Sequence, residues 1–367
     1  HGTYSDGLSY WAAQANASIR SEPVTPQPPP IPSGSRPHFT SMPDLALRDL
    51  GGAVVWTNDD LFAESQNLIK TPPAQYQPAT FGHKGQVYDG WETRRRRRTG
   101  VDQAIVRLGA PGVVYGVVVD TSWFKGNYPP FISVEAAAVE GVVSAEQLVE
   151  DTEWVTIVEK QAVDGDTRNP FKVDATNRFT HVRLTMHPDG GVARFRVHGR
   201  GVPDPHFFRY GHFDLAALEN GGLITACSNM FYSSPNNLLM PGRARHMGEG
   251  WETSRRRDEG NDWVQVRLAG QGLVSLVELD TSYFLGNAPG SAMVRGRDGD
   301  GEWFEVLPRT ELQPDTRHRF VLDLDRPMTE ARMDIYPDGG MARFKLYGTL
   351  TDESQARLIE QWERGEA

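Results

Sequence analysis

The sequence predicts an all-β protein made of two tandem jelly-roll β-sandwich domains. Three observations lead to this prediction: a long internal repeat, short segments rich in β-branched and aromatic residues, and turn sequences of Gly, Pro, Asn and Asp between them. With 367 residues, the chain is long enough for two domains that each bury a core. We therefore expect two antiparallel sandwiches and few helices.

The internal repeat pairs motifs of the two halves in the same order. "DGWETRRRRRTGVDQAIVRLG" around Trp91 returns around Trp251 as "EGWETSRRRDEGNDWVQVRLA", and "VVVDTSWFKGNYP" returns as "VELDTSYFLGNAP". Further on, "DTEWVTI" and "MHPDGGVARFRVHG" correspond to "DGEWFEV" and "IYPDGGMARFKLYG". Each copy is large enough for a core of its own, so the repeat indicates two homologous domains rather than a solenoid.

Local patterns within each copy favour strands and tight turns. "GVVYGVVVD" is typical of a buried strand that ends in a polar turn, and "VARFRVHG" alternates as a half-buried strand does. The "PDGG" sequences predict turns, because Pro fixes φ and Gly accepts positive φ. "EGVVSAEQLVE" occurs only in the first copy and predicts a surface insertion. The acidic turn after Thr351 predicts one terminal helix.

These patterns divide the chain into five parts. We expect a Pro-rich flexible segment at 1–37, the first repeat at 38–200, a linker at 201–222, the second repeat at 223–350 and a helix or tail at 351–367. The first part contains "SEPVTPQPPPIPSGSRP", a composition typical of an extended, polyproline-like segment. Because the chain starts with His1, we expect some of this part to be foreign to the natural protein.

The composition limits the classes of molecule that we expect the protein to bind. There are 48 acidic against 38 basic residues, a formal net charge of −10, which disfavours a nucleic-acid binder. No apolar stretch is long enough to span a bilayer, and the amino terminus lacks the pattern of a secretory signal. The single cysteine, Cys227, excludes an intramolecular disulfide. We therefore expect a cytoplasmic protein with no membrane partner.

Five consecutive arginines, Arg94–Arg98, form a local positive charge in this otherwise acidic sequence. A basic run of this length is a common flag for nucleic-acid binding. In the second copy, however, Ser254 replaces Arg94, and Asp258 replaces Arg98. No interleaved aromatic residues offer bases a stacking surface either. The two copies share Gly-Trp-Glu-Thr and three arginines, which indicates a local site rather than a charged surface for nucleic acid.

The repeated motifs resemble those of a known family. "DGWETRR", "DTSWFKGN" and "YPDGGMARFKLYG", together with "NNLLMPGRARHMGEGWETSRRR", look like the motifs of allantoicase, an enzyme of ureide breakdown. The resemblance covers roughly residues 44–350, both repeats. It implies jelly rolls of the galactose-binding-like kind and hydrolysis of allantoate to ureidoglycolate and urea, a step of purine catabolism. One departure is that "GSAMVRG" stands in the second copy where the first keeps "FISVEAA".

The implied reaction sets the chemistry that the site must supply. Allantoate carries one carboxylate and two ureido groups on a single carbon, so releasing urea needs no Ser or Cys nucleophile. Elimination of urea followed by addition of water requires a general acid, a general base and an arginine for the carboxylate. We expect a small-molecule ureide as substrate, no cofactor and no metal, since the histidines lack close liganding spacing.

The candidate residues lie in the repeated motifs. We expect catalytic roles for Glu92, Asp120 and His187. We expect substrate binding by Arg95, Arg97, Thr121, Asn127, Glu252, Arg255, Asp280 and Asn287. Arg95 and Arg255 follow Gly-Trp-Glu-Thr in both copies, so they are our choice for the carboxylate. The first repeat is our choice for the chemistry, since it keeps "GNYPPFISVEA" and His187.

Structural alternatives remain open for the same residues. Asp120 and Thr121 end a buried strand, where they also suit an Asx-type turn that caps backbone amides. Burial would raise the pKa of Glu92, whereas a bridge to a neighbouring arginine would lower it. His187 titrates near neutrality, yet Tyr336 occupies its position in the second copy.

Two further interpretations concern function and assembly. Tandem jelly rolls also serve as carbohydrate-binding modules without catalysis, and fold alone does not decide between the two. A purely structural or interaction module, with the Pro-rich segment as its partner-binding part, is a third possibility. Because both copies keep site motifs, a polar site between domains or subunits is conceivable, and we expect a homo-oligomer.

Overall fold

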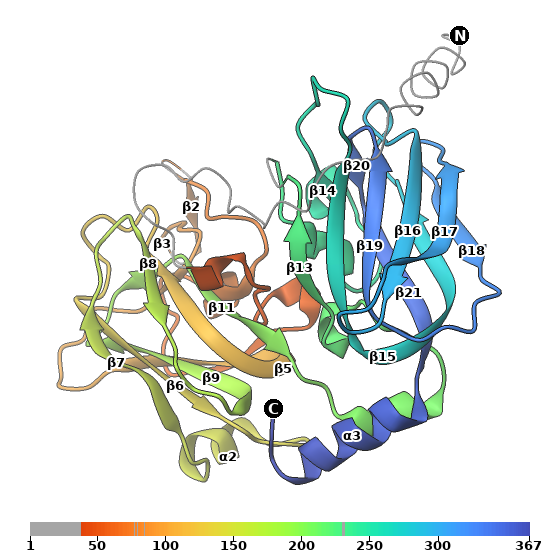
Figure 1. Cartoon of the computed structure of the whole chain (residues 1–367). Helices are drawn as coiled ribbons and strands as arrows, with labels where there is room; N and C mark the ends of the chain where they lie inside the picture. Colours follow the sequence, from red (N-terminus) through yellow and green to blue (C-terminus); the bar gives the residue numbers. More distant parts are fainter. Residues whose placement is uncertain (1–37, 77, 79, 84, 230–231) are drawn as a thin grey trace. The chain divides into compact units, whose positions relative to one another are not determined.

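The computed structural model describes residues 38–76, 78, 80–83, 85–229 and 232–367. They form two compact units, 38–203 together with 366–367, and 204–365, which we call the first and the second repeat. The Pro-rich segment predicted at 1–37 lies outside the described residues. Both repeats consist mainly of antiparallel strands, as Figure 1 shows, which confirms the predicted all-β class.

The first repeat contains eleven strands, three short 3₁₀ segments and one short α-helix among the residues described. In chain order these are η1 (His38–Ser41), η2 (Arg48–Leu50), β1 (Ala53–Thr57), η3 (Ser65–Ile69), β2 (Phe81–Gly82), β3 (Gly85–Gln86), β4 (Trp91–Glu92), β5 (Asp102–Asp120), β6 (Phe131–Ala137), α2 (Ala145–Glu150), β7 (Val155–Ala162), β8 (Arg168–Lys172), β9 (Arg178–His187), β10 (Gly191–Val192), β11 (Arg194–Gly201) and, at the start of the next unit, η4 (Pro205–Tyr210).

The second repeat has the same order of elements, without a counterpart of the β2–β3 hairpin or of α2 in its described part. After η4 it comprises β12 (Phe213–Asp214), η5 (Leu218–Asn220), β13 (Leu223–Cys227), η6 (Pro235–Leu239), η7 (Met247–Glu249), β14 (Trp251–Glu252), β15 (Asp262–Asp280), β16 (Ser291–Arg297), β17 (Phe304–Glu311), β18 (Arg317–Val321), β19 (Met328–Tyr336), β20 (Gly340–Met341), β21 (Arg343–Leu350) and α3 (Asp352–Glu363).

One long strand serves both layers of each sandwich. The first part of β5 pairs with β1 and β9, and its second part pairs with β8 and β11. The register shifts between Arg107 and Gly112, where the strand passes from one layer to the other. Gly112 is required there, because a Cβ would lie 2.0 Å from the carbonyl oxygen of Arg200. Strand β15 does the same with β13 and β19, then with β18 and β21.

The two layers of each repeat enclose an apolar core. In the first repeat Ile105, Val119, Leu184 and Phe195 come from β5, β9 and β11 and are fully buried. The outer strands β6 and β7 extend the sheet beyond β9, giving the order β1-β5-β9-β6-β7. The second repeat has the matching order β15-β19-β16-β17, visible as adjacent arrows in Figure 1. This double-layered arrangement confirms the predicted tandem jelly rolls.

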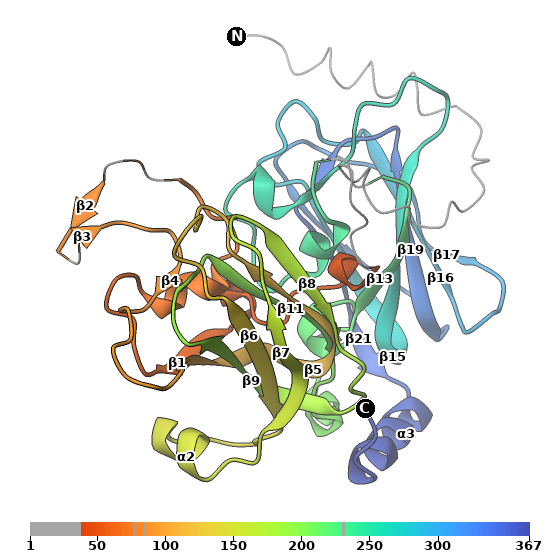
Figure 2. The same ribbon diagram turned by 90° about the vertical axis from the view of Figure 1, so that its left-hand side faces the viewer.

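The segments outside the sandwiches differ between the repeats. The predicted insertion forms α2, whose capping box at Ser144 fixes its start. The β2–β3 hairpin projects from the first repeat, as Figure 2 shows. Residues 205–220, predicted as part of a linker, form η4, β12 and η5, and β12 pairs with β21 of the second repeat. The predicted terminal helix is α3, capped by the Thr351 side chain.

A search of the described residues finds no helix that is both long and apolar enough to cross a bilayer.

Candidate active site

Three segments meet at one end of each sandwich. In the first repeat they are the arginine loop (residues 93–101), the GN loop (121–130) and the PDGG turn (188–191). Strand β4 pairs with β10, which brings Glu92 opposite Gly191. The amide of Gly191 donates to the carbonyl oxygen of Asn127 at 2.7 Å, which fixes the GN loop to the turn. Residues distant in sequence are therefore held together by backbone bonds.

A glutamate and an asparagine form the centre of this arrangement. Asn127 Nδ2 donates to Glu92 Oε1 at 2.8 Å, and Glu92 Oε2 is shielded from solvent with no hydrogen-bond partner among the described residues. Burial raises the pKa of the Glu92 carboxyl, and the hydrogen bond from Asn127 opposes part of this rise. A carboxyl with a raised pKa and a free oxygen is suited to donate a proton.

The second repeat builds the same pair from its own motifs. Asn287 Nδ2 donates to Glu252 Oε1 at 2.7 Å, and the amide of Gly340 donates to the carbonyl oxygen of Asn287 at 2.8 Å. Its arginine loop (253–261), GN loop (281–290) and PDGG turn (337–340) thus repeat the first constellation. The structure therefore brings Glu92 together with Asn127 and Glu252 together with Asn287, four residues that the sequence predicted individually.

The arginines of the run alternate between structural and free side chains. Arg94 pairs with Asp59 (Nε to Oδ2, 2.5 Å), and Arg96 pairs with the buried Asp102 (Nη1 to Oδ1, 2.6 Å). Arg95 and Arg97 are exposed and have no ion-pair or hydrogen-bond partner within the part of the chain that is described. Arg98 is exposed and unpaired as well among the described residues, so three cations remain available to a ligand, and the choice of Arg95 and Arg97 stays a prediction.

The second arginine loop follows the same pattern. Arg256 Nη1 lies 2.8 Å from Asp262 Oδ1, as Arg96 does from Asp102. Arg255 and Arg257 are exposed and have no hydrogen bond or ion pair among the residues described, although the charge of Arg255 acts on Asp338. The backbone amides of Arg96 and Arg256 each donate to an aspartate of the PDGG turn at 2.6 Å, which locks both loops in place.

Those turn aspartates, Asp189 and Asp338, were not among the predicted site residues. The sequence analysis treated "PDGG" as a turn and gave no role to its aspartate. Its presence in both copies, within the repeated "PDGG" motif, was a signal for a shared contact. In the structure, Oδ2 of each carboxylate accepts a hydrogen bond from a backbone amide of the arginine loop and so orients that loop.

Asp120 and Thr121 hold the GN loop at its start. Asp120 Oδ1 accepts hydrogen bonds from the amide and the hydroxyl of Ser122, the Asx-turn alternative. Thr121 is fully buried, and its hydroxyl donates to the carbonyl oxygen of Asp164 at 2.6 Å. In the second repeat Asp280 Oδ1 accepts from the amide of Ser282, and the Thr281 hydroxyl donates to the carbonyl oxygen of Gln313. This geometry favours positioning roles for these four residues.

His187 lies at the end of β9 and faces the sheet. Its Nε2 is 2.8 Å from the hydroxyl oxygen of Ser133, and no contact with Glu92 or Asn127 is found among the described residues. Burial and the nearby Lys160 lower the pKa of His187, with Glu135 acting in the opposite sense. The ring is therefore neutral at pH 7 and held by the sheet rather than by the Glu92 pair.

Aromatic residues flank the first glutamate, and sequence reasoning missed them. Tyr88 stacks on Phe124 with ring centroids 5.6 Å apart, and Tyr76 contacts Trp123 at 5.3 Å. Burial, and then the charge of Glu92, raise the pKa of Tyr88, so this phenol lies near the carboxyl. These rings line a cavity of about 20 Å³, the size of one water molecule. The second copy has Gly248 where the first has Tyr88.

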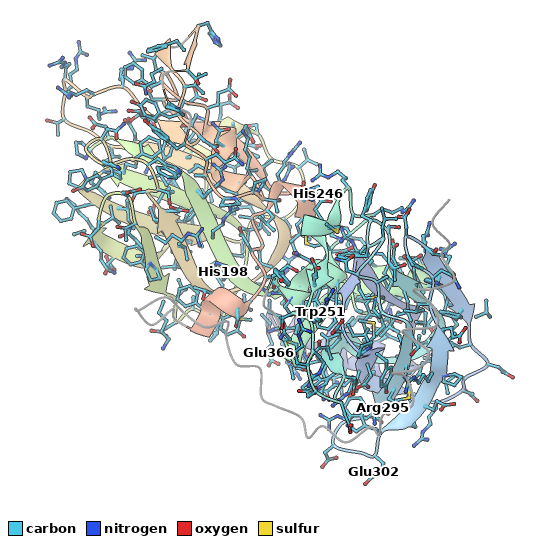
Figure 3. The ribbon with its side chains drawn as sticks, turned by 90° about the horizontal axis from the view of Figure 1, so that it is seen from above. His198, His246, Trp251, Arg295, Glu302 and Glu366 are labelled. Carbon is cyan, nitrogen blue, oxygen red and sulfur yellow. The ribbon has the colours of Figure 1, made fainter. Side chains whose placement is uncertain are left out.

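The two tryptophans beside the glutamates are core residues. Trp91 and Trp251 are completely buried, and the indole N–H of each donates to a backbone carbonyl, of Asp59 and Asn229 respectively. Figure 3 labels Trp251 within the second repeat. Among the residues described, no group of three or more His, Cys, Asp or Glu side chains is placed to hold a metal ion.

Comparisons with known proteins assign the repeats to one family. A family model described as "Allantoicase repeat" matches residues 43–202 and 213–351. A "Probable allantoicase" of Nocardia farcinica is 60% identical over 85% of this chain and 95% of its own, and an "Allantoicase" of Dictyostelium discoideum is 40% identical over 84% and 87%. The crystal structure of an allantoicase from Saccharomyces cerevisiae matches with a TM-score of 0.73 and 34% identity, covering 84% of this chain and 96% of that one.

Proposed function

The chain belongs to the allantoicase family, and we infer that it hydrolyses allantoate to ureidoglycolate and urea with Glu92 as the group that carries the proton. Relatives named allantoicase match most of its length, which supports the reaction. The observation that supports the residue is the buried carboxyl of Glu92, bound by Asn127 at one oxygen and free at the other.

The reaction breaks a bond between nitrogen and the central carbon of allantoate. That carbon carries a hydrogen, a carboxylate and two ureido groups. When one ureido nitrogen takes up a proton, its bond to carbon breaks and urea leaves. The lone pair of the other ureido nitrogen forms a C=N bond, which leaves an N-acyliminium ion. Water then adds to the carbon and loses one proton, which gives ureidoglycolate.

A single carboxyl is sufficient for both proton transfers. Neutral Glu92 donates its proton to the departing nitrogen, and the resulting carboxylate accepts the proton of the attacking water. Asn127 holds Oε1, so the rotation of the carboxyl is restricted and Oε2 is the atom that exchanges the proton. The raised pKa of Glu92 favours the neutral form in which the cycle begins.

The free arginines supply the counter-charge for the substrate carboxylate. A guanidinium presents a planar fork that matches two carboxylate oxygens. Arg95 is our choice, with Arg97 beside it, because their neighbours Arg94 and Arg96 are already neutralised by Asp59 and Asp102. Arg255 would do the same beside Glu252 and Asn287. Asp120, Thr121, Asp280 and Thr281 position the loops, and His187 is not required for the proton cycle.

The test is urea release from allantoate by the purified protein, with and without added divalent metal. We expect urea and ureidoglycolate in equal amounts without nucleotide or redox cofactor. A tandem carbohydrate-binding module, the alternative from the sequence, would bind glycans and release no urea, so a glycan panel run in parallel separates the two. Absence of urea under all conditions would contradict the assignment.

Assembly and location complete the proposal. We propose a cytoplasmic homo-oligomer that binds a small ureide. Matching site motifs in both repeats and a free, buried Cys227 are the supporting features. Sedimentation at micromolar concentration tests the assembly, and a purely monomeric species would contradict it.

A further inference from the structure

One face of the second repeat, on strands β16, β17 and β19, carries four arginines. Arg297 is paired with Glu330, and the other three have one acidic ion-pair partner between them among the described residues, Asp334, although Glu305 lies opposite Arg295 in register. Arg295 on β16 lies directly opposite Arg332 on β19, two like charges in register. Such a pair is destabilising unless something compensates it. Asp334 does so in part: Arg295 Nη2 lies 3.1 Å from its Oδ2, and Arg332 Nη2 lies 3.0 Å from its Oδ1. Figure 3 labels Arg295 on the second repeat.

The third arginine, Arg309 on β17, has no acidic partner among the described residues. Its guanidinium carbon lies 3.8 Å from the ring centre of Tyr336, and its Nε donates to the Ser291 hydroxyl at 3.0 Å. Burial lowers the pKa of this guanidinium, and the nearby Tyr336 opposes the change. A partly desolvated cation that lacks a counter-ion is costly, so the cluster is incomplete without an anion.

Three donors of the cluster are shielded from solvent yet unsatisfied. They are Arg309 Nη2, Arg295 Nε and the hydroxyl of Tyr336, none of which has a hydrogen-bond partner among the residues described. Tyr336 is 4% exposed. Burial raises the pKa of Tyr336 to about 12, so its hydroxyl stays protonated and available as a donor. Buried polar groups are normally satisfied, so these donors indicate a missing acceptor.

The first repeat shows what the same face looks like when it is complete. Glu135 and Arg183, in the register of Arg295 and Arg332, form an ion pair of 2.6 Å between Arg183 Nε and Glu135 Oε2. His187, at the position of Tyr336, is bonded to Ser133. Lys160, at the position of Arg309, is also a cation and lies over the Phe131 ring. Among the described residues, the unsatisfied donors are therefore what distinguishes this face of the second repeat, and they do not follow from the fold.

We propose that this face of the second repeat, around Arg295, Arg309 and Tyr336, binds a small carboxylate anion. A carboxylate presents two acceptor oxygens to N–H donors and to the phenol, and its charge balances Arg309. The cluster adjoins the Glu252–Asn287 pair, because Tyr336 precedes the PDGG turn and Ser291 follows the GN loop, but no hydrogen bond joins the two groups among the described residues. The proposal does not depend on which repeat cleaves allantoate, or on cleavage at all.

The experiment measures glycolate binding by isothermal titration calorimetry in the full chain. An Arg95→Gln, Arg255→Gln background removes the arginine-loop cations, so that the remaining binding reports the β16–β17–β19 face. In this background we expect one bound glycolate. Arg309→Gln should weaken its binding about tenfold or more, since a charge-assisted bond is lost. Lys160→Gln, which alters the first repeat's β7, is the matched control and should leave it unchanged.

Tyr336→Phe covers the case in which Arg309→Gln does not fold. It removes only the hydroxyl, and we expect severalfold weaker binding with an unchanged thermal transition. No glycolate binding in the background protein, binding that neither variant weakens, or a preference for phosphate over glycolate would each overturn the proposal. Water alone would then satisfy the donors, or the ligand class would be wrong. Failure of urea release by the wild type bears only on the proposed function.

Discussion

Glu92 and Glu252 accept the same hydrogen bond, from Asn127 at 2.8 Å and from Asn287 at 2.7 Å, but in different surroundings. Aromatic rings that include Tyr88 flank Glu92, whose second oxygen is shielded. Beside Glu252, Gly248 replaces the tyrosine, and Asn287 Nδ2 lies 3.8 Å from Met247 Sδ. The comparison teaches that the repeat preserves the frame of a site, while the side chains that surround its carboxyl differ from one repeat to the other.

The largest effect that this comparison predicts is the loss of the proton carrier. Glu92→Gln should lower kcat for urea release by about 10²–10⁴-fold, because the amide keeps the shape and the Asn127 neighbour but cannot cycle a proton. Glu252→Gln is the matched control, with an expected change below about tenfold. The reverse order of the two effects would move the chemistry to the second repeat.

The next effect concerns substrate binding. Arg95→Gln should raise KM about ten- to a hundredfold with a smaller change in kcat, since a charge-assisted contact of roughly 1.5–3 kcal/mol is lost. Arg98→Gln serves as control, because Arg98 is exposed and has Asp258 at its position in the second copy. Steady-state kinetics of both variants would show whether position within the run matters; equal effects would indicate a diffuse charge instead of a clamp.

The pH dependence of kcat tests the protonation state of the Glu92 carboxyl. Because the neutral form of Glu92 starts the cycle and burial raises its pKa, kcat should fall as pH rises through that pKa. Asn127→Ala removes the bond that lowers the pKa, so the alkaline limb should move to higher pH. Asn287→Ala should leave the limb in place. A downward shift with Asn127→Ala would contradict the proposed role of this bond.

The smallest effect expected is that of Tyr88→Phe. The ring keeps its stack on Phe124 and loses only the hydrogen bond from its hydroxyl to Gln86 Oε1. We expect a change in kcat/KM below about tenfold and a change in stability of about 1 kcal/mol, from kinetics and urea unfolding. A loss as large as that of Glu92→Gln would assign the phenol a direct part in proton transfer.

The fold could be predicted from the sequence because the residue pattern of its strands is periodic and its motifs occur twice. Alternation predicted strands such as β11, and the paired motifs predicted two sandwiches of one kind. The division of the chain was less accessible, since residues 205–220 have the composition of a linker and pair with β21 only in three dimensions. A short strand such as β12 carries too little pattern to be recognised.

The candidate site could be predicted from the sequence only in part, because the sequence does not show which side chains become hydrogen-bond partners in the folded chain. The motifs predicted Glu92 and Asn127, and the structure joins them. They favoured Arg95 over Arg96 by its position in the motif, but they could not show that Arg96 is paired, since its partner Asp102 is known only from the folded chain. The sequence predicted a catalytic role for Asp120, whereas in the structure its carboxylate accepts two hydrogen bonds from Ser122 within a turn.

The PDGG turn also has a consequence for how mutations spread through the site. Gly190 has φ of 145°, and a Cβ on it would lie 2.6 Å from Pro129 N and 2.9 Å from the carbonyl oxygen of Asn127. A methyl group at this position would displace the GN loop, and with it the amide that orients Glu92. Gly190, which has no side chain, thus determines the orientation of the Glu92 carboxyl. It is therefore one of the most sensitive positions in the enzyme, although it carries no functional group.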